Sequence, residues 1–314
     1  MMSDITISHL SVTFETSRGP VFAVRDLNTV FRAGQISGVI GESGSGKSVM
    51  GMSILRLLPN NAHVEGTCLY ENEDLYTVPL RRLRQVRGGV IGLIPQNPGA
   101  SLDPIMRIRR QITETIEAHD RKSGRRTADA RAAELLRSFG FDEAERILDR
   151  YSFQMSGGMN QRLVSALGLA CQPGWIIADE PTKGLDAVIR NQVYQVLRQI
   201  CQEGARSMIV ITHDLMLARR LCDDIRVMYM GQIIEQGPAE NVMETPRHPY
   251  TQGLIASLPS RGMQPIPQAD PARAADGGCP FYPRCARASS RCAAAQPGEL
   301  PRPGGGSVRC FLYE

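Results

Sequence analysis

Eight consecutive residues have the types and spacing of a phosphate-binding loop: Gly41, Glu42, Ser43, Gly44, Ser45, Gly46, Lys47 and Ser48. Glycines allow the backbone angles that turn successive N–H groups toward one anion, and a following helix points its positive end at the same place. Lys47 can reach the β- and γ-phosphates of a nucleotide, and the Ser48 hydroxyl can ligate Mg²⁺. The apolar run 36–40 before the loop and a helical pattern from Lys47 to Leu58 after it supply the strand and helix that this chemistry needs.

Two adjacent acids, Asp179 and Glu180, follow a second apolar run at 175–178. The carboxyl end of a buried parallel strand would present both acids beside the phosphates. Asp179 would then hold Mg²⁺ through water, and Glu180 would polarise the attacking water. A pair of acids at a helix N-terminus is the alternative reading of such a sequence, and the phosphate loop favours the catalytic one.

A further anion site is predicted where Ser156, Gly157 and Gly158 begin a helical pattern. A serine and backbone N–H groups at a helix N-terminus suit a phosphate. One domain with two phosphate sites indicates either two nucleotides or one nucleotide shared by two chains.

The elements that position these motifs alternate between strands and helices, which is typical of an α/β fold with a mainly parallel sheet. Alternating apolar residues from Ile5 to Phe14 predict an edge strand, and a second strand is expected to begin at Val21, after a turn at 17–20. Further strands are predicted at 90–94, 175–178, 208–211 and 227–230, and a helix at 186–201. Residues 97–172 are charged and helix-forming, which predicts a helical subdomain inserted into the α/β core.

These motifs, in this order, resemble those of the ATP-binding subunits of ABC transporters, over about Ile5 to Pro259. The resemblance implies a P-loop NTPase (RecA-like) core with an antiparallel β edge subdomain, the helical insertion, and binding of ATP and Mg²⁺. It also assigns roles to single residues. Gln96 would be the Q-loop residue that touches Mg²⁺, and Ser156 to Gln161 would be the signature motif. Asp186 would be the D-loop acid and His213 the switch histidine, while Phe14, with Phe22 as its rival, would be the aromatic that stacks on adenine.

The same resemblance implies a head-to-tail pair of ATPase subunits. The Ser156 and Gly158 region of one chain would close over the γ-phosphate held by the P-loop of the other. Lys183-Gly184 stands where the D-loop usually has Ser or Thr followed by Ala, which would tune communication between the paired sites rather than abolish hydrolysis.

Three runs are similar to those of the importers of dipeptides, oligopeptides and nickel: 97–104, 247–254, and the tail sequence Cys279-Pro-Phe-Tyr-Pro-Arg-Cys285. This resemblance implies two integral membrane permeases, a second ABC ATPase in a heterodimer, and an extracytoplasmic solute-binding protein. Peptides are the default cargo, with nickel chelates and opine-like amino acid conjugates as alternatives.

Composition limits the other function classes. The chain is 42% hydrophobic with a net charge of +4, too small a charge to indicate nucleic acid. Basic runs at 81–87 and 121–126 leave a nucleic-acid-acting ABC ATPase as an alternative, but no aromatic residues interleave with them for base stacking. Without a signal peptide or about 20 consecutive apolar residues, the chain is expected at the cytoplasmic face of the inner membrane as a peripheral subunit.

The eight cysteines fall into two groups. Cys68, Cys171, Cys201 and Cys222 are scattered and are expected to be small buried residues. Cys279, Cys285, Cys292 and Cys310 lie in a Pro- and Gly-rich Cys-rich extension, 259–314, which we expect to follow an ABC ATPase domain at 1–258. Four thiolates suit a [4Fe–4S] cluster, which similar importer subunits carry at this tail, or a zinc ion; four free thiols are the third possibility.

Overall fold

The computed structural model describes residues 2–120, 124–204, 207–270 and 277–314. Its contacts divide the chain into two compact units. The first unit comprises Met1–Asp4, Arg32–Ile36 and Tyr70–Ile211, and the second comprises Ile5–Phe31, Ser37–Leu69 and Thr212–Glu314. The boundary proposed between residues 258 and 259 falls inside the second unit, and part of the basic run at 121–126, residues 121–123, lies outside the described ranges.

The first unit combines parallel strands with a set of helices. Its elements are β5 (Glu73–Asp74), α2 (Leu80–Gly89), β6 (Ile91–Ile94), α3 (Pro98–Ser101), α4 (Ile108–His119), α5 (Arg125–Ser138), α6 (Ala144–Leu148), a 3₁₀ turn (Ser152–Gln154), α7 (Gly157–Leu169), β7 (Trp175–Asp179), α8 (Ala187–Gly204) and β8 (Ser207–Thr212). Strands β6, β7 and β8 run parallel, with Ile94 beside Ala178 and Asp179 beside Ile211. Every residue of β7 and β8 is buried, as expected for strands covered on both faces.

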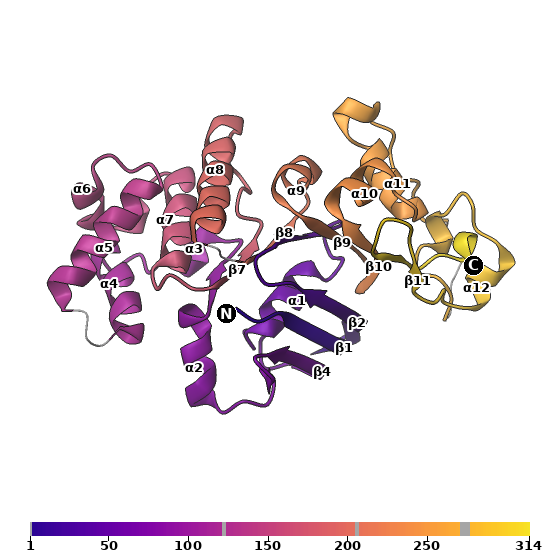
Figure 1. Cartoon of the computed structure of the whole chain (residues 1–314), viewed down its shortest axis with the longest axis horizontal. Helices are drawn as coiled ribbons and strands as arrows, with labels where there is room; N and C mark the ends of the chain where they lie inside the picture. The colour runs from indigo at the N-terminus through magenta and orange to yellow at the C-terminus, as the bar shows by residue number, and fades with distance from the viewer. Residues whose placement is uncertain (1, 121–123, 205–206, 271–276) are drawn as a thin grey trace. The chain divides into compact units, whose positions relative to one another are not determined.

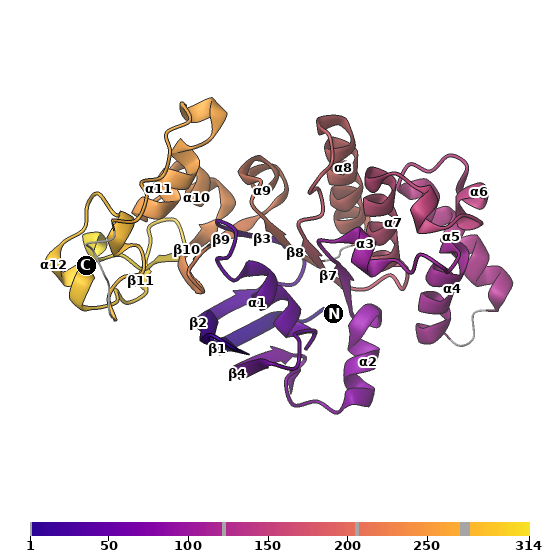
Figure 2. The ribbon, with the colours of Figure 1, turned by 180° about the vertical axis from the view of Figure 1, so that it is seen from behind.

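The helices between β6 and β7 form the magenta group of Figures 1 and 2. In α4 the residues Ile108, Ile112 and Ile116 recur every four positions and are buried. In α5 the residues Ala128 and Leu136 are buried in the same periodic way, and the two helices contact each other. This periodicity places the apolar side chains of each helix on one face.

The second unit contains the β-hairpin, the phosphate loop and the tail. Its elements are β1 (Ile5–Thr16), β2 (Gly19–Phe31), β3 (Ile36–Ile40), α1 (Lys47–Ile54), β4 (Ala62–Tyr70), α9 (Leu215–Leu221), β9 (Asp224–Tyr229), β10 (Gln232–Pro238), α10 (Ala239–Glu244), α11 (Pro249–Ala256), 3₁₀ turns (Pro259–Arg261, Tyr282–Arg284 and Phe311–Tyr313), α12 (Ser290–Ala294), β11 (Leu300–Pro301) and β12 (Ser307–Val308). In this unit β3 lies parallel to β9, and β10 pairs antiparallel with β9.

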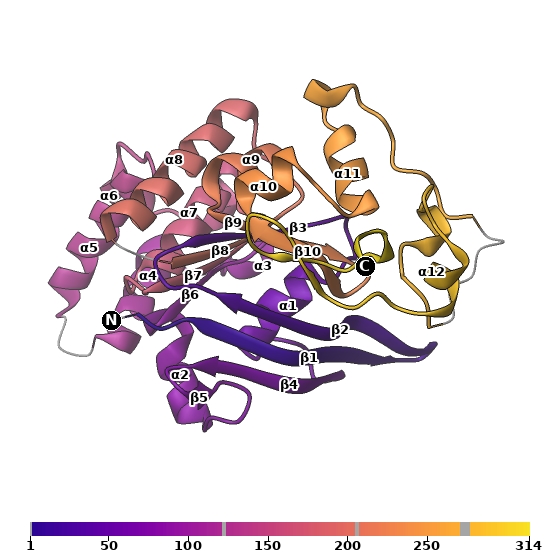
Figure 3. The same cartoon turned by 45° about the vertical axis from the view of Figure 1, so that its right-hand side comes forward.

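The prediction that residues 5–14 form an edge strand is wrong in one respect. These residues do form a strand, and the turn at 17–20 joins β1 to β2 in an antiparallel hairpin. However, β1 lies between β2 and β4, so it is an inner strand (Figure 3). Strand β4 carries no clear strand pattern in the sequence, because exposed polar residues interrupt its apolar residues.

The tail is ordered over its described residues despite its proline and glycine content. Strand β12 pairs antiparallel with β10, placing Val308 beside Glu235, and β11 pairs with β12. The side chains of Val308 and Phe281 are 1% and 2% exposed. The tail thus continues the β10 edge and buries apolar side chains of its own.

None of the helices in the described ranges combines the length and apolar content that a membrane crossing needs.

Candidate functional site: the phosphate loop and its neighbours

The phosphate loop lies between β3, whose five residues are buried, and α1, which begins at Lys47. Gly41 has φ +150° and a side chain there would come within 2.2 Å of the Met228 carbonyl oxygen. Gly46 has φ +97°, and a side chain there would come within 2.3 Å of the Ala23 carbonyl oxygen. Both positions therefore exclude any side chain, so the glycine spacing of the motif has a steric cause.

The Lys47 ammonium folds back over the loop. Its Nζ donates to the carbonyl oxygens of Gly41 at 2.9 Å and Glu42 at 2.8 Å, and lies 3.3 Å from Ser45 Oγ. The residue is 6% exposed. A lysine ammonium in this position could replace its hydrogen bonds to loop oxygens with hydrogen bonds to phosphate oxygens. The half-buried Ser48 follows in the first turn of α1.

In the first unit, three predicted site residues gather at one edge of the parallel strands. Gln96 lies two residues beyond β6, while Asp179 ends β7 and Glu180 follows it. Ile94 stands beside Ala178 in the β6–β7 register, so these side chains emerge at the same carboxyl-terminal edge. Asp179 and Glu180 are each 6% exposed. The phosphate loop belongs to the second unit, so its meeting with this edge stays a prediction.

Glu180 has a backbone conformation that few residues other than glycine adopt. Its φ is +50°. The Glu180 N–H donates to the Ile211 carbonyl oxygen at 2.8 Å, and the Glu180 carbonyl accepts from the Lys183 N–H at 3.0 Å. Such left-handed residues cost about 1–3 kcal/mol and gather at functional sites, where the surrounding structure holds them.

The signature residues begin α7 as predicted for a helix N-terminus. The Ser156 Oγ accepts from the Met159 N–H at 3.3 Å, and both Ser156 and Gly157 are exposed, while Gly158 is half-buried. Gln161 is 2% exposed, and its Nε2 has no hydrogen-bond partner among the described residues. Ser156 and Gly157 therefore lie open to a ligand, and Gln161 faces inward.

Asp186 and His213 lie beside helix starts. The exposed Asp186 accepts from the N–H groups of Val188 and Ile189 at 2.9 and 3.0 Å, so it caps α8. His213 is exposed after β8 and precedes Asp214, which caps α9. The two residues belong to different units, and their nucleotide roles stay predictions.

The two aromatic candidates for adenine stacking lie on the neighbouring strands β1 and β2 of the hairpin, at positions that point to opposite faces of the sheet. Phe14 pairs with Val21, and Phe22 pairs with Thr13. Phe14 is half-buried, whereas Phe22 is 54% exposed with the Arg25 guanidinium 5.4 Å from its ring centre. Phe22 also precedes Ala23, whose carbonyl lies against Gly46 of the phosphate loop. The choice between the two rings stays open.

The four tail cysteines converge on a single small pocket of about 20 Å³. None of the eight cysteines, all of which lie in the described ranges, forms a disulfide bond. Burial raises the pKa of Cys279 to about 11, and burial also raises the pKa of Cys310. Within the described ranges, no group of three or more His, Cys, Asp or Glu side chains is arranged to hold a metal ion. The thiols thus share a pocket without the arrangement of a metal centre.

The scattered cysteines behave mainly as expected. Cys68, Cys201 and Cys222 are buried. Cys171 is only half-buried, and its thiol donates to the Thr115 carbonyl oxygen at 3.2 Å.

Two residues that the sequence analysis did not assign to the site contact the phosphate loop. The Tyr250 hydroxyl accepts from the Glu42 N–H, and the Arg284 guanidinium binds the Glu42 carboxylate. Both stand in the runs that resemble peptide importers, so their position in those runs was the available signal.

Comparison with known proteins gives two family matches. The family described as ABC transporter matches residues 24–183, and the family described as oligopeptide/dipeptide transporter, C-terminal region, matches residues 234–292. Among solved structures, a dimeric bacterial ABC transporter cassette superposes with a TM-score of 0.68 at 25% identity, covering 75% of this chain and 98% of that one.

Several relatives match almost end to end. A Brucella abortus protein named as a peptide import ATP-binding protein is 40% identical, over 98% of this chain and 94% of the relative. The oligopeptide transport ATP-binding protein AppD of Bacillus subtilis is 36% identical, over 100% and 98%. The corresponding OppD of Escherichia coli is 36% identical, over 96% and 90%. With the phosphate loop and the ordered tail in place, these matches show that the chain belongs to the ATP-binding subunits of the oligopeptide and dipeptide ABC transporters.

Proposed function

We propose that this chain is the ATP-hydrolysing subunit of a peptide importer, where it drives permease movement by binding and hydrolysing ATP. The observation that carries the proposal is the end-to-end similarity to peptide and oligopeptide transport ATP-binding proteins. The phosphate loop supports it, because Lys47 and the loop backbone supply the donors that a triphosphate needs.

Reconstitution in vesicles tests this function. The chain, its two permeases, its partner ATPase and the solute-binding protein should together take up labelled peptides only when ATP is present. A matched assembly carrying Lys47→Ala should bind peptide outside and import none. Uptake of nickel chelates or opine-like conjugates in place of peptides would change the cargo while keeping the motor role. ATP turnover without uptake of any of the three would contradict import.

We propose that Glu180 is the general base, Asp179 and Ser48 hold Mg²⁺ with Gln96, and His213 contacts the γ-phosphate. The buried edge where β6 and β7 end supports the roles of Gln96, Asp179 and Glu180. The left-handed backbone at Glu180 supports its role further, since a strained residue persists where function needs its side chain fixed.

We propose that two ATPase subunits pair because each nucleotide site is formed by residues of both subunits. Ser156 and Gly157 are exposed at the N-terminus of α7, where backbone N–H groups suit an anion. We propose that they close over the γ-phosphate bound to a partner ATPase, in a heterodimer whose helical segment 97–172 docks on the permeases. Turnover by the purified chain should then depend steeply on added partner. Full ATP turnover by a verified monomer would contradict a nucleotide site shared between two subunits.

We further propose that the tail binds a metal centre, a [4Fe–4S] cluster first and zinc as the alternative. Four thiols around one pocket support this donor set. A pocket of about 20 Å³ has room for about one water, so the cysteine-bearing turns would have to move apart around a cluster. Anaerobic protein with about four irons per chain supports the cluster; one zinc instead supports the alternative; and neither metal, with four reactive thiols, rejects both.

A further inference from the structure

The tail and the phosphate loop are joined by a two-pronged ion pair, although 242 residues separate the partners. Arg284 Nη1 donates to Glu42 Oε2 at 2.7 Å, and Nη2 donates to Oε1 at 3.0 Å. The Arg284 side chain is 16% exposed and the Glu42 side chain 38%. Bidentate arginine–carboxylate pairs of this geometry hold orientation as well as charge.

A second contact holds the backbone of Glu42. The Glu42 N–H donates to the Tyr250 hydroxyl at 2.8 Å. Tyr250 is fully buried, and its ring packs with those of Tyr229 and Phe281 at centroid distances of 4.6 and 5.5 Å. Tyr250 thus holds the Glu42 N–H while Arg284 holds the Glu42 carboxylate, so the position of the second residue of the loop depends on both contacts.

Glu42 in turn sets the position of the loop lysine. The Glu42 carbonyl oxygen accepts from Lys47 Nζ at 2.8 Å and from the Ser45 N–H at 3.2 Å. A shift of Glu42 would therefore move the ammonium group and the turn on which phosphate binding depends. The N–H of Glu42 donates to Tyr250, so the backbone of this residue is held on both its donor and its acceptor side.

The Arg284 end of the ion pair lies next to Cys285, one of the four cysteines that line the small pocket of the tail. Arg284 closes the 3₁₀ turn Tyr282–Arg284, directly before Cys285. The Cys285 N–H donates to the Tyr282 carbonyl at 3.3 Å, and Arg284 Nε donates to the Pro267 carbonyl at 2.8 Å. Any rearrangement of the turn that carries Cys285 therefore also moves the Arg284 guanidinium.

We propose that Arg284 is a positioning residue for ATP: through Glu42 it holds the phosphate loop and Lys47, so that the conformation of the cysteine-bearing tail sets nucleotide affinity. By linkage, the coupling is reciprocal, and bound nucleotide stabilises the tail turn by the same factor. The role requires no metal in the tail and does not depend on the cargo of the transporter.

A double-mutant cycle on the full chain tests the proposal, with the dissociation constant of MgATP as the measurement. Arg284→Gln and Glu42→Ala should each weaken binding by about five- to tenfold, the scale of a partly exposed charged hydrogen bond. The double variant should bind MgATP no more weakly than either single variant, because both substitutions break the same ion pair. Arg291→Gln is the matched control, since Arg291 lies in the same tail and pairs with Glu314 instead.

A charge effect without positioning predicts a different pattern. Glu42→Ala would then tighten ATP binding, Arg284→Gln would weaken it, and the double variant would return to the parent value. That pattern, or unchanged affinity in Arg284→Gln, would overturn the proposal. If Arg284→Gln does not fold, Arg284→Lys supplies the same comparison, because lysine keeps the charge and loses the two-pronged geometry.

Hydrogen exchange distinguishes coupling between nucleotide and tail through Arg284 from a purely structural role of this residue. Exchange of the backbone N–H groups of residues 281–286 should slow on addition of MgATP in the parent and in Arg291→Gln. In Arg284→Gln the same nucleotide, at saturating concentration, should leave this exchange unchanged. Equal nucleotide-dependent protection in the parent and Arg284→Gln would show that the coupling does not pass through Arg284.

Discussion

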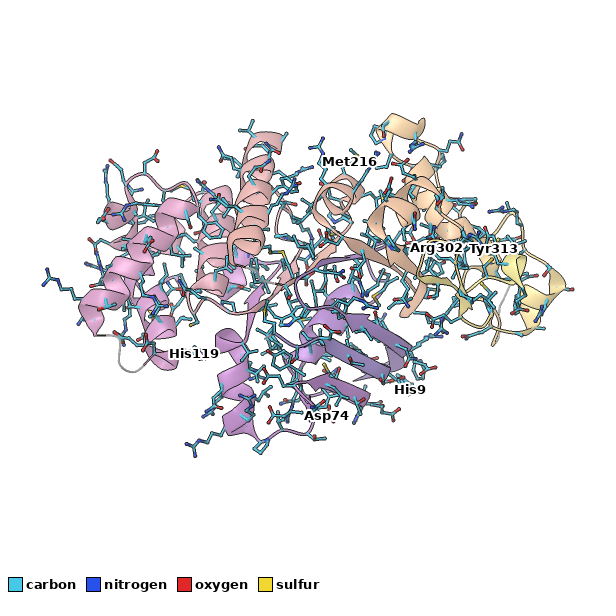
Figure 4. The ribbon with its side chains drawn as sticks, viewed as in Figure 1. His9, Asp74, His119, Met216, Arg302 and Tyr313 are labelled. Atoms are coloured by element: carbon cyan, nitrogen blue, oxygen red, sulfur yellow. The ribbon has the colours of Figure 1, made fainter. Side chains whose placement is uncertain are left out.

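The Glu235 carboxylate and the Arg302 guanidinium meet at 2.8 Å with both side chains buried, at 0% and 1% exposure. Glu235 also accepts from the N–H groups of Arg247 and His248, at 2.8 and 2.9 Å. Arg302 also donates to the Thr245 carbonyl oxygen at 3.0 Å. One buried ion pair thus joins β10, the segment before α11, and the tail (Arg302 is labelled in Figure 4).

Removing Arg302 should therefore destabilise the protein strongly. Arg302→Ala leaves the Glu235 carboxylate buried without its charged partner, which typically costs about 3–5 kcal/mol. Urea unfolding followed by circular dichroism measures the change. Arg309→Ala is the control, because Arg309 is 22% exposed and lies 3.7 Å from Glu299, so it should cost less than about 1 kcal/mol. Equal effects of the two variants would contradict a special role for the buried pair.

Glu180→Gln should separate ATP binding from hydrolysis. The variant keeps the size of the side chain and loses the base, so turnover should fall on the order of a hundredfold or more while ATP affinity is kept. The closed pair of ATPases should accumulate with ATP, because the γ-phosphate continues to link the two subunits. Light scattering detects the pair, and a phosphate-release assay measures turnover. Hydrolysis near the parent rate would remove Glu180 from the reaction.

Lys47→Ala should act at the earlier step of nucleotide binding. The variant loses the charged donor that now binds the Gly41 and Glu42 carbonyl oxygens and that we expect to reach the phosphates. Equilibrium titration should show affinity for MgATP lowered by about tenfold or more, the scale of a charged hydrogen bond. A thermal unfolding curve serves as the check on folding. Unchanged affinity in a folded variant would place Lys47 outside the phosphate site.

Stability should fall on acidification because of His248. Burial, with the nearby Arg287 charge, lowers the pKa of His248 to about 3 from an ordinary 6.5. The unfolded chain therefore binds the extra proton first, so this contribution is complete above about pH 6.5 and is lost as the pH falls toward 3. The free energy of unfolding should drop by up to about 1.4 kcal/mol per pH unit in that window.

His248→Asn tests the assignment without removing the helix cap. The His248 Nδ1 accepts from the Tyr250 N–H at 3.0 Å, and asparagine can accept the same bond. The variant should lose most of the acid slope between pH 6.5 and 4. An identical slope in parent and variant would attribute the acid sensitivity to other groups.

The sequence predicted the local features well because their causes are local. The phosphate loop could be read directly, since its first and last glycines, Gly41 and Gly46, stand where a side chain would strike Met228 or Ala23. The buried strands β7 and β8 were found within a residue or two because continuous apolar runs mark them. The ABC fold followed from the order of such motifs.

Features that depend on distant partners could not be read in this way. The inner position of β1 depends on β4, whose exposed residues hide its strand pattern. The order of the tail depends on pairing with β10 and on the buried partner of Arg302, neither of which composition reveals. Tyr250 and Arg284 were noted only as parts of a resemblance, since nothing in their own neighbourhood points to Glu42.

The distance in sequence between Glu42 and Arg284 has a consequence for protein synthesis. A ribosome adding about 5–20 residues per second makes the phosphate loop first and Arg284 only after 242 further residues, a delay on the order of tens of seconds. During that interval the nascent chain carries the loop without the side chain that holds it, and a chain released early never acquires it. A residue translated late therefore completes a motif that was made much earlier.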